Sequence, residues 1–190
     1  AIGDLRSIRS SFSFRPTRPD NIRWSAELGG GSLMDVGCYC VNVSRTMAKA
    51  EPAEVQAWAR WRESGVDEQL AGTLRFENGV LAQFDCSLTM NRHETYEVCG
   101  TDGSLRVPVA FLPGAKDALI HERHGAEATL HTVPGIDEYV LMVEHFADCV
   151  LYGHSPRYSA AEAALNMSVI EALLRSAQNG GNPVQLSANR

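Results

Sequence analysis

The chain has 190 residues, of which 44% are hydrophobic and 21% charged, so it is long enough to bury a core of ordinary globular composition. Its net charge of −6 argues against a nucleic-acid partner, because phosphate backbones are bound by basic surfaces. No stretch of about 20 apolar residues occurs, and we recognise no signal peptide or targeting tail. We therefore expect a protein without a membrane partner.

The five cysteines and six histidines form no metal-binding pattern. The cysteines are odd in number and scattered, which is typical of a reducing compartment, and we expect a cytoplasmic protein. Cys38 and Cys40 lie two residues apart in a predicted helix and point to nearly opposite sides, so one metal ion could not bind both. No two histidines are four residues apart, and His121 and His124 lie in a predicted strand and turn. We predict no metal site.

The N-terminal part of the chain reads as a strand followed by a helix. Residues 5–14 are rich in β-branched and aromatic residues and place Ile8, Ser10 and Phe12 on one face. Prolines follow and end this strand. A run of three glycines at 29–31 predicts a flexible approach to a helix that continues to residue 48.

The middle of the chain alternates apolar and polar residues with a period of two, which predicts strands. The strands expected from this pattern cover residues 54–62, 68–76, 80–88, 92–100, 104–111, 118–124 and 126–132. Asn78-Gly79 and Asp102-Gly103 are hairpin signals. Because the strands follow one another through short turns, we predict an antiparallel meander.

Two helices and a short strand complete the prediction. Residues 139–153 have an apolar stripe of helical spacing formed by Tyr139, Met142, Val143, Phe146 and Val150. Ser159 and Glu162 form a capping box for a helix that runs to about residue 178, and residues 183–186 form the last strand. The order of elements predicts an α+β fold: an open, predominantly antiparallel sheet with helices packed on one face.

A row of polar residues marks the helix after the glycines. Asp35, Tyr39, Asn42 and Thr46 stand at i, i+4, i+7 and i+11 and share a stripe roughly 60° wide. The apolar face beside it is formed by Leu33, Val36, Cys40, Val43 and Met47. Such a row is most often a solvated face, but solvated faces favour Lys, Glu and Gln. Poor helix formers clustered beside a tyrosine favour a site.

The residues of this row could transfer a proton to or from a carbinol oxygen. Tyr39 could act as the general acid or base if a positive charge lowers its pKa from about 10. Asp35 and Asn42 could hydrogen-bond a substrate hydroxyl or orient the phenol. The alternative for Tyr39 is a tyrosine at the edge of the core. No G-x-G-x-x-G motif occurs, so we predict no cofactor-binding residues in this chain.

Several motifs together resemble the C-terminal domain of the Gfo/Idh/MocA oxidoreductases. The branch of glucose–fructose oxidoreductase, dimeric dihydrodiol dehydrogenase and NADP-dependent xylose dehydrogenase is the most similar. The motifs are Ile2-Gly-Asp-Leu-Arg6, Gly29-Gly-Gly-Ser-Leu-Met-Asp-Val-Gly-Cys-Tyr39, Gly65-Val-Asp-Glu68, Phe76-Glu-Asn-Gly79, Cys99-Gly-Thr-Asp-Gly-Ser104 and Glu144-His-Phe146.

The resemblance implies a substrate-binding and dimerisation domain, with the open sheet face used for dimerisation. An N-terminal Rossmann domain, absent from this chain, would bind NAD or NADP and supply a catalytic lysine. Tyr39 would be the general acid/base and Asp35 its neighbour, and Asn42 matches a position that is often aspartate. Lys49 and Lys116 lack the context of the catalytic lysine. We therefore expect Tyr39 to titrate near its unperturbed value here.

Two hypotheses follow. In the first, residues 1–190 are the single substrate-binding and dimerisation domain of an NAD(P)-dependent oxidoreductase for a sugar, a polyol or a related carbinol or carbonyl compound. Arg23 and Trp24 would line the pocket beside Tyr39, Asp35 and Asn42, and the chain alone would be inactive. In the second, the chain is a free-standing, non-catalytic binding or scaffold module that self-associates through its sheet face.

Overall fold

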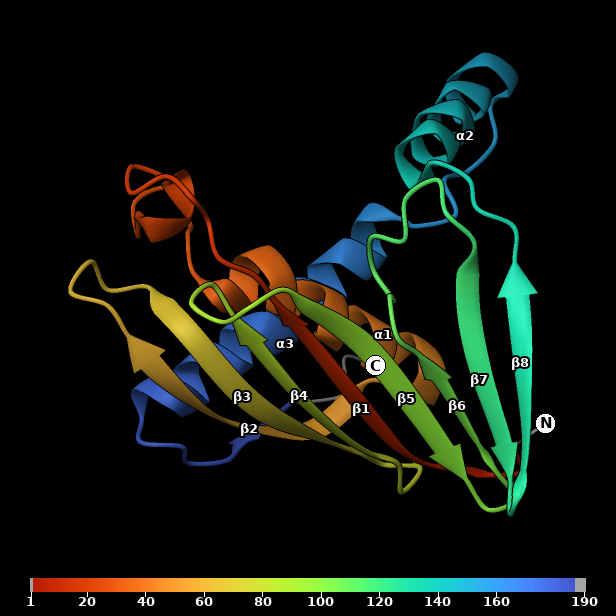
Figure 1. Ribbon diagram of the computed structural model, residues 1–190. Coiled ribbons are helices and arrows are strands. Elements are labelled where there is room, and N and C mark those ends of the chain that lie inside the picture. Colours follow the sequence, from red (N-terminus) through yellow and green to blue (C-terminus); the bar gives the residue numbers. More distant parts are fainter. Residues whose placement is uncertain (1, 187–190) are drawn as a thin grey trace.

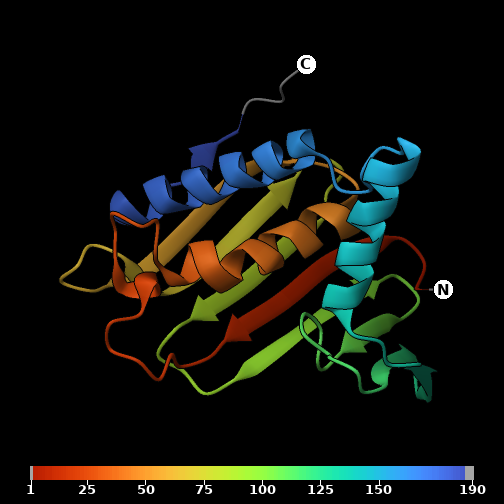
Figure 2. The same cartoon turned by 90° about the horizontal axis from the view of Figure 1, so that it is seen from above.

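A nine-stranded sheet forms one layer of the protein, and helices lie on one of its faces (Figures 1 and 2). The computed structural model describes residues 2–186. Its strands are β1 (Leu5–Ser13), β2 (Pro52–Trp61), β3 (Asp67–Phe76), β4 (Leu81–Ser87), β5 (His93–Gly100), β6 (Ser104–Val107), β7 (Ala118–His124), β8 (Glu127–Val133) and β9 (Val184–Gln185). Their order in the sheet is β8-β7-β6-β5-β1-β4-β3-β2-β9. The predicted fold class, α+β with an open and predominantly antiparallel sheet, is confirmed.

The first strand lies in the middle of the sheet, where it interrupts the predicted meander. β1 pairs with β4 in parallel and with β5 antiparallel, so Ile8 is placed between Ala82 and Val98. The prediction that consecutive strands pair throughout is therefore wrong at β4 and β5. This strand is central because it has a neighbouring strand on each side and α1 packs over one of its faces. Ser11 and Ser13, on the face turned away from α1, are also buried.

The predicted hairpins form where their turn residues stand. Antiparallel pairs join β3 to β4, β5 to β6, and β7 to β8. β6 ends at Val107, four residues earlier than predicted, and Pro108 follows directly. Proline has no amide hydrogen to donate to a neighbouring strand, which accounts for the early end.

The helix after the glycines begins with a π-turn, η2 (Leu33–Gly37), and continues as α1 (Cys38–Ala48). A π-turn adds about one residue to a helical turn, which rotates all following side chains by about 100°. The buried residues of α1 are Cys40, Val41, Ser44, Arg45 and Ala48. Val43 and Met47 are only half-buried, and of these two Met47 packs against the core. The prediction that both continue the core-facing side of the helix therefore holds for Met47 and is wrong for Val43.

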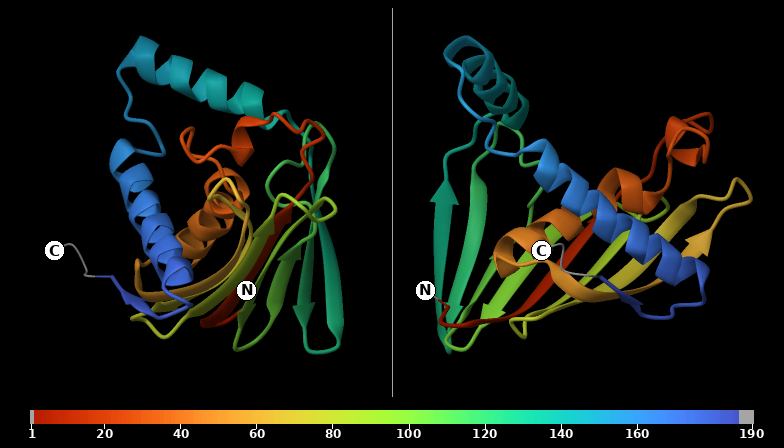
Figure 3. Two further views of the ribbon diagram at one scale, coloured as in Figure 1. Left: turned by 90° about the vertical axis from the view of Figure 1, so that its left-hand side faces the viewer. Right: turned by 180° about the vertical axis from the view of Figure 1, so that it is seen from behind.

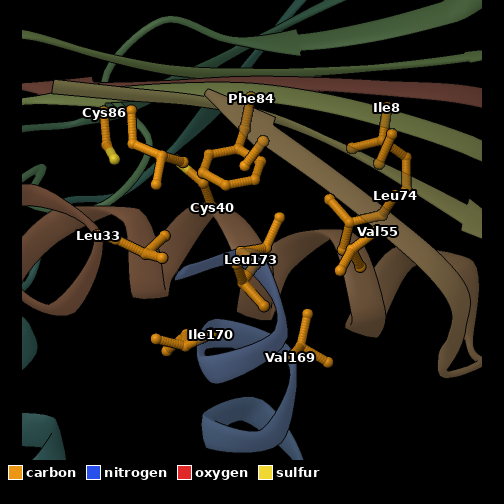
Figure 4. Packing of buried hydrophobic residues seen from close by; sticks show 14 of the residues in the cluster. Ile8, Leu33, Cys40, Val55, Leu74, Phe84, Cys86, Val169, Ile170 and Leu173 are labelled. Atoms are coloured by element: carbon orange, nitrogen blue, oxygen red, sulfur yellow. The ribbon is translucent and has the colours of Figure 1, made fainter. Parts of the chain in front are cut away.

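The core lies between the sheet, α1 and α3 (Ala160–Gln178) (Figure 4). Side chains from the covered face of the sheet meet side chains from both helices, and those labelled in the figure are Ile8, Leu33, Cys40, Val55, Leu74, Phe84, Cys86, Val169, Ile170 and Leu173. Ser159 caps α3 as predicted, because its hydroxyl accepts a hydrogen bond from the Glu162 amide at 3.2 Å. The alternating strands thus supply one half of the core and the amphipathic helices the other.

A buried arginine joins the two core helices. Arg45 donates from Nε and Nη2 to the carboxylate of Glu51, both at 2.7 Å, and from Nη2 to Glu162 at 3.2 Å. Asn166 of α3 donates to the Cys38 carbonyl at 3.2 Å. These bonds connect α3 to the first turn of α1, where Tyr39 lies, and fix the direction of that helix.

The helix α2 (Glu138–Tyr152) forms as predicted, but its apolar side does not pack into the core. Figures 1 and 3 show it standing apart from the sheet, beyond β7 and β8. Among its residues only Cys149 is buried. No helix of residues 2–186 is long and apolar enough to cross a membrane.

Candidate functional site

A hollow of about 260 Å³ opens near the C-terminal end of β1. It is lined by Phe12, Phe14, Arg23, Asp35, Val36, Tyr39, Arg92, Leu112 and Tyr139. Three of the five predicted site residues, Arg23, Asp35 and Tyr39, therefore meet in one place. Val36 lies beside Asp35 in the same helical segment. The other lining residues come from the end of β1 and the residue after it, from the segments around β5 and β6, and from the start of α2, so sequence spacing could not reveal them.

Two aromatic rings hold Tyr39 at the edge of this hollow. Its ring centroid lies 5.6 Å from that of Phe12 and 5.8 Å from that of Phe111, and Phe12 and Phe111 stack at 5.1 Å. Offset and tilted contacts of this kind are favourable between aromatic rings. Tyr39 is nevertheless 44% exposed, so its ring is fixed while the residue remains accessible.

Asp35 is paired with Arg23 at the same hollow. The Arg23 Nε donates to Asp35 Oδ2 at 2.6 Å, and its guanidinium lies 5.3 Å from the centroid of Phe14. Arg23 belongs to a short 3₁₀ helix, η1 (Ile22–Trp24). The glycine run ties η1 to η2, because the Gly31 amide donates to the Arg23 carbonyl at 2.9 Å. The glycines therefore serve to bring Arg23 beside Asp35.

Arg92 is a lining residue that no sequence signal identified. It donates to Glu94 Oε1 from Nε at 3.1 Å and from Nη2 at 2.5 Å. The buried Glu94 also accepts hydrogen bonds from the amides of Phe111 at 3.2 Å and Leu112 at 2.8 Å. Glu94 thus anchors both Arg92 and the loop that follows β6, which forms one wall of the hollow.

Two predicted substrate-binding residues lie outside the lining of this hollow. Asn42, one turn further along α1, donates from Nδ2 to the Tyr158 hydroxyl at 2.9 Å. Trp24 lies under the guanidinium of Arg62, 4.3 Å from its ring centroid. Both side chains already have partners within the fold, and the structure does not bring them to Tyr39.

The pKa of Tyr39 is raised rather than unperturbed. Burial is the largest cause, and the nearby Cys38, Tyr139 and Asp35 add to it, whereas the positive charge of Arg23 lowers the pKa. Burial also raises the pKa of the Cys38 thiol to about 11. At neutral pH both groups are therefore protonated, and Tyr39 is a proton donor.

The charges of Arg23 and Asp35 should influence the titration of the Tyr39 phenol. We expect Asp35→Asn to lower the pKa of Tyr39 and Arg23→Gln to raise it, measured by NMR of the labelled phenol carbon and assigned with Tyr39→Phe. Because the pKa of folded Tyr39 lies above the unfolded value of about 10, this group stabilises the fold fully below that pH and less as the pH rises through the folded pKa.

Tyr96 provides the control for this titration, since burial is the one cause that raises its pKa. Its midpoint should not move in either variant. A Tyr39 midpoint that is the same in wild type and both variants would show that the Arg23–Asp35 pair does not act on the phenol.

The glycine run does not offer a phosphate cradle. The amides of Gly29, Gly30 and Gly31 donate to the carbonyls of Ala26, Ser25 and Arg23, and the Leu33 amide donates to Asp67. A pyrophosphate at a helix N-terminus needs free amides after a strand, whereas this run follows η1. Within residues 2–186 no group of three or more His, Cys, Asp or Glu residues could hold a metal ion.

The chain is similar over most of its length to several proteins named as dehydrogenases, reductases or oxidoreductases. The chain is 35% identical to D-xylose 1-dehydrogenase (NADP(+)) 2 of Haloferax volcanii over 182 residues, 94% of this chain and 56% of that protein. It is 28% identical to trans-1,2-dihydrobenzene-1,2-diol dehydrogenase of Sus scrofa over 183 residues, 90% of this chain and 53% of that protein. The aldose-aldose oxidoreductase of Caulobacter crescentus, crystallised with glycerol, matches with a TM-score of 0.86 at 25% identity, covering 97% of this chain and 56% of that one.

A 3-ketoreductase of Actinomadura kijaniata, crystallised with NADP and TDP-benzene, matches with a TM-score of 0.86 at 28% identity, covering 92% of this chain and 55% of that chain. Residues 1–106 match the GFO/IDH/MocA C-terminal domain. The chain belongs to the GFO/IDH/MocA family and corresponds to its C-terminal domain, which confirms the resemblance found in the sequence. It spans little more than half the length of these relatives.

Proposed function

We propose that the chain is the substrate-binding half of an NAD(P)-dependent oxidoreductase that acts on a sugar, a polyol or a related carbinol or carbonyl compound. The observation that carries the proposal is the accessible Tyr39 phenol in one hollow with the Arg23–Asp35 pair. Two relatives support a carbohydrate-like substrate: the xylose dehydrogenase, and a dTDP-3,4-didehydro-2,6-dideoxy-alpha-D-glucose 3-reductase of Actinomadura kijaniata that is 28% identical to this chain over 181 residues.

In this proposal Tyr39 exchanges a proton with the reacting oxygen of the substrate. During reduction of a carbonyl, the phenol donates its proton to the oxygen, and during oxidation the phenolate accepts it. The nicotinamide cofactor supplies or accepts the hydride when it is bound. The raised pKa of Tyr39 favours the donating role until a further positive charge approaches.

Asp35 and the aromatic rings would hold the substrate. The Arg23 bond to Oδ2 fixes the Asp35 carboxylate, which leaves Oδ1 to accept a hydrogen bond from a substrate hydroxyl. Phe12 and Phe14 form apolar surface in the same lining. A few fixed polar groups on an otherwise apolar wall are typical of small-molecule sites.

We further propose that catalysis needs a dinucleotide-binding half, which would bind NAD or NADP and bring a cationic lysine to Tyr39. The internally bonded glycine amides and the raised pKa of Tyr39 both support this division of roles. The chain by itself would then bind substrate without turnover. In this proposal residues 1–190 act as one domain.

Self-association through the open face of the sheet is part of the same proposal. Across this face the register aligns Arg9, Glu97, Arg106 and His121 in one row, with charges of both signs. A hollow of about 510 Å³ lies in this region, lined in part by Glu97, Arg106 and His121. Opposite charges in a row suit an isologous contact, in which the same patch is used on both copies.

The proposed function is tested with the 190-residue chain and a panel of sugars. We expect NMR shifts of Tyr39 and Asp35 on titration with a bound sugar, and no oxidation of NADH or NADPH above the buffer rate. Robust turnover would contradict the division of roles, and a chain that binds no member of the panel would favour the scaffold hypothesis. The coding sequence before Ala1 gives an independent test, since a βαβ glycine fingerprint there is expected.

A further inference from the structure

The helix α2 presents an apolar surface that nothing in residues 2–186 covers. Its large side chains are exposed to an extent unusual for such residues, with Phe146 at 63% and Val150 at 69%. The others that exceed one-third exposure are Tyr139, Val140, Leu141, Met142, Val143, Leu151 and Tyr152. Figure 3 shows the helix held away from the sheet. Contiguous exposed apolar patches of this kind mark interaction surfaces.

Five of these exposed side chains form one stripe along α2. Tyr139, Met142, Val143, Phe146 and Val150 repeat at helical spacing, and we call these five residues the α2 stripe. The charged residues Glu144 and Asp148 lie on another side of the helix. The helix is also fixed at its start, where Glu138 accepts a hydrogen bond from the Gly114 amide at 3.1 Å. A capped helix with an apolar stripe is built to pack against a further element.

The position of the α2 stripe identifies its partner. Tyr139, its first residue, also lines the hollow that contains Tyr39 and Arg23, so the stripe is continuous with the site. The hydride exchanged in the proposed reaction must reach the substrate at this hollow. Whatever presents the nicotinamide there must therefore lie beside the N-terminal end of α2.

A second copy of the chain bound through the open sheet face would not cover this stripe. α2 lies on the same side of the sheet as α1 and α3 (Figures 1 and 2), whereas Arg9 and Glu97 project from the opposite face. The relatives also have nearly half of their length outside the matched region, since the chain covers 56% of the xylose dehydrogenase. That length is sufficient for a dinucleotide-binding domain.

We infer that the α2 stripe is the docking surface for the dinucleotide-binding half, and that its docking closes the hollow beside Tyr39. This inference rests on the proposed function. Apolar contacts along α2 hold the two halves together, while Tyr139 at the end of the stripe forms part of both the contact surface and the hollow. Closure excludes water from the proton-transfer site and strengthens the electrostatic action of nearby charges.

Hydrogen exchange of the α2 amides tests this inference. The 190-residue chain is compared with the same chain extended by the coding sequence that precedes Ala1. We expect exchange of residues 138–152 to slow by about 10-fold or more in the extended protein, because docking suppresses local opening. Equal exchange in both proteins, or a gene without a dinucleotide-binding half, would overturn the inference.

A triple variant isolates the stripe. Met142→Gln, Phe146→Gln and Val150→Gln remove its apolar surface but keep good helix formers and leave Tyr139 in place. In the extended protein the triple variant should restore fast exchange of α2. Leu81→Gln, at an apolar site on the opposite face that is 54% exposed, should leave exchange slow. A triple variant that remains protected would contradict docking through the stripe.

Two further measurements exclude other occupants. In the 190-residue chain the triple variant should melt at the wild-type temperature, while Leu173→Ala should melt lower, because Leu173 is buried. A lower melting temperature for the triple variant would show that the chain covers its own stripe. Light scattering tests whether a second copy covers the stripe. A dimer of the 190-residue chain that is lost in the triple variant would show that it does, and we expect no such dimer.

The outcomes separate this inference from the proposed function. Turnover of NADPH with a sugar by an extended protein whose α2 exchanges freely would support the function and overturn the docking. Slow exchange of α2 without turnover would support the docking and count against the function.

Discussion

Tyr39→Phe should lower kcat by about 10²-fold or more in the protein that contains both halves, with a much smaller change in KM. The substitution removes the proton that the phenol would donate and keeps the ring that packs against Phe12 and Phe111. Steady-state kinetics with a sugar substrate and NAD or NADP provide the measurement. The pH–rate profile of Tyr39→Phe should keep its acidic limb and lose the limb that reports the titration of the Tyr39 phenol.

The same substitution should leave stability almost unchanged. Among residues 2–186 the Tyr39 hydroxyl has no hydrogen-bond partner, so its loss breaks no bond of the fold. Tyr158→Phe is the matched control, because that hydroxyl bonds to Asn42 outside the hollow. We expect Tyr158→Phe to keep kcat within a few-fold of wild type. If both variants had equal kinetics, Tyr39 would be a packing residue and the proposed proton transfer would be wrong.

Gly31→Ala should destabilise the fold by about 3 kcal/mol or more, as measured by urea unfolding. Gly31 has a φ of +112°, which L-residues rarely adopt, and a Cβ atom built there would lie 2.2 Å from Asp67 Oδ1. The buried Asp67 accepts hydrogen bonds from the Ser32 hydroxyl at 2.6 Å and the Leu33 amide at 2.8 Å. Displacing this carboxylate would leave two buried donors at the start of η2 without a partner.

Gly29→Ala separates backbone strain from the loss of this anchor. Gly29 also has a positive φ, +68°, but a Cβ atom there meets nothing within 4 Å. Its cost should be that of the left-handed conformation alone, about 1–2 kcal/mol. Equal losses in the two variants would show that the Asp67 anchor contributes nothing beyond backbone strain. The NMR signal of Tyr39 should shift in Gly31→Ala and stay unchanged in Gly29→Ala, because η2 leads directly into α1.

Local patterns were sufficient for most of the elements. The period-two alternation in residues 68–76 and the Asn78-Gly79 turn are complete within a short segment, and they predict β3, β4 and their hairpin. The same holds for α3, where the Ser159 cap stands directly before the helix. These features depend only on residues that are close together in the chain, and the sequence alone is therefore sufficient to predict them.

The site was predictable only in part. Asp35 and Tyr39 share one helix, so their proximity follows from their spacing, and the family resemblance pointed to the same pair. The contributions of Arg92 and Tyr139 depend on contacts across more than fifty residues of chain. The departure of Asn42 from the hollow goes with its bond to Tyr158, 116 residues away. The periodicity of apolar residues within one segment does not indicate such contacts between distant segments.

What the sequence by itself determined is the set of strands and helices, the α+β class and the phenol–carboxylate pair, because short-range periodicity and turn chemistry encode them. Only the tertiary structure decided that β1 inserts between β4 and β5, that a π-turn rotates the buried face of α1, and that the apolar side of α2 faces away from the core. Each of these depends on how distant segments compete for the same neighbours. That competition is settled by packing and hydrogen bonding over the whole chain rather than by any one segment.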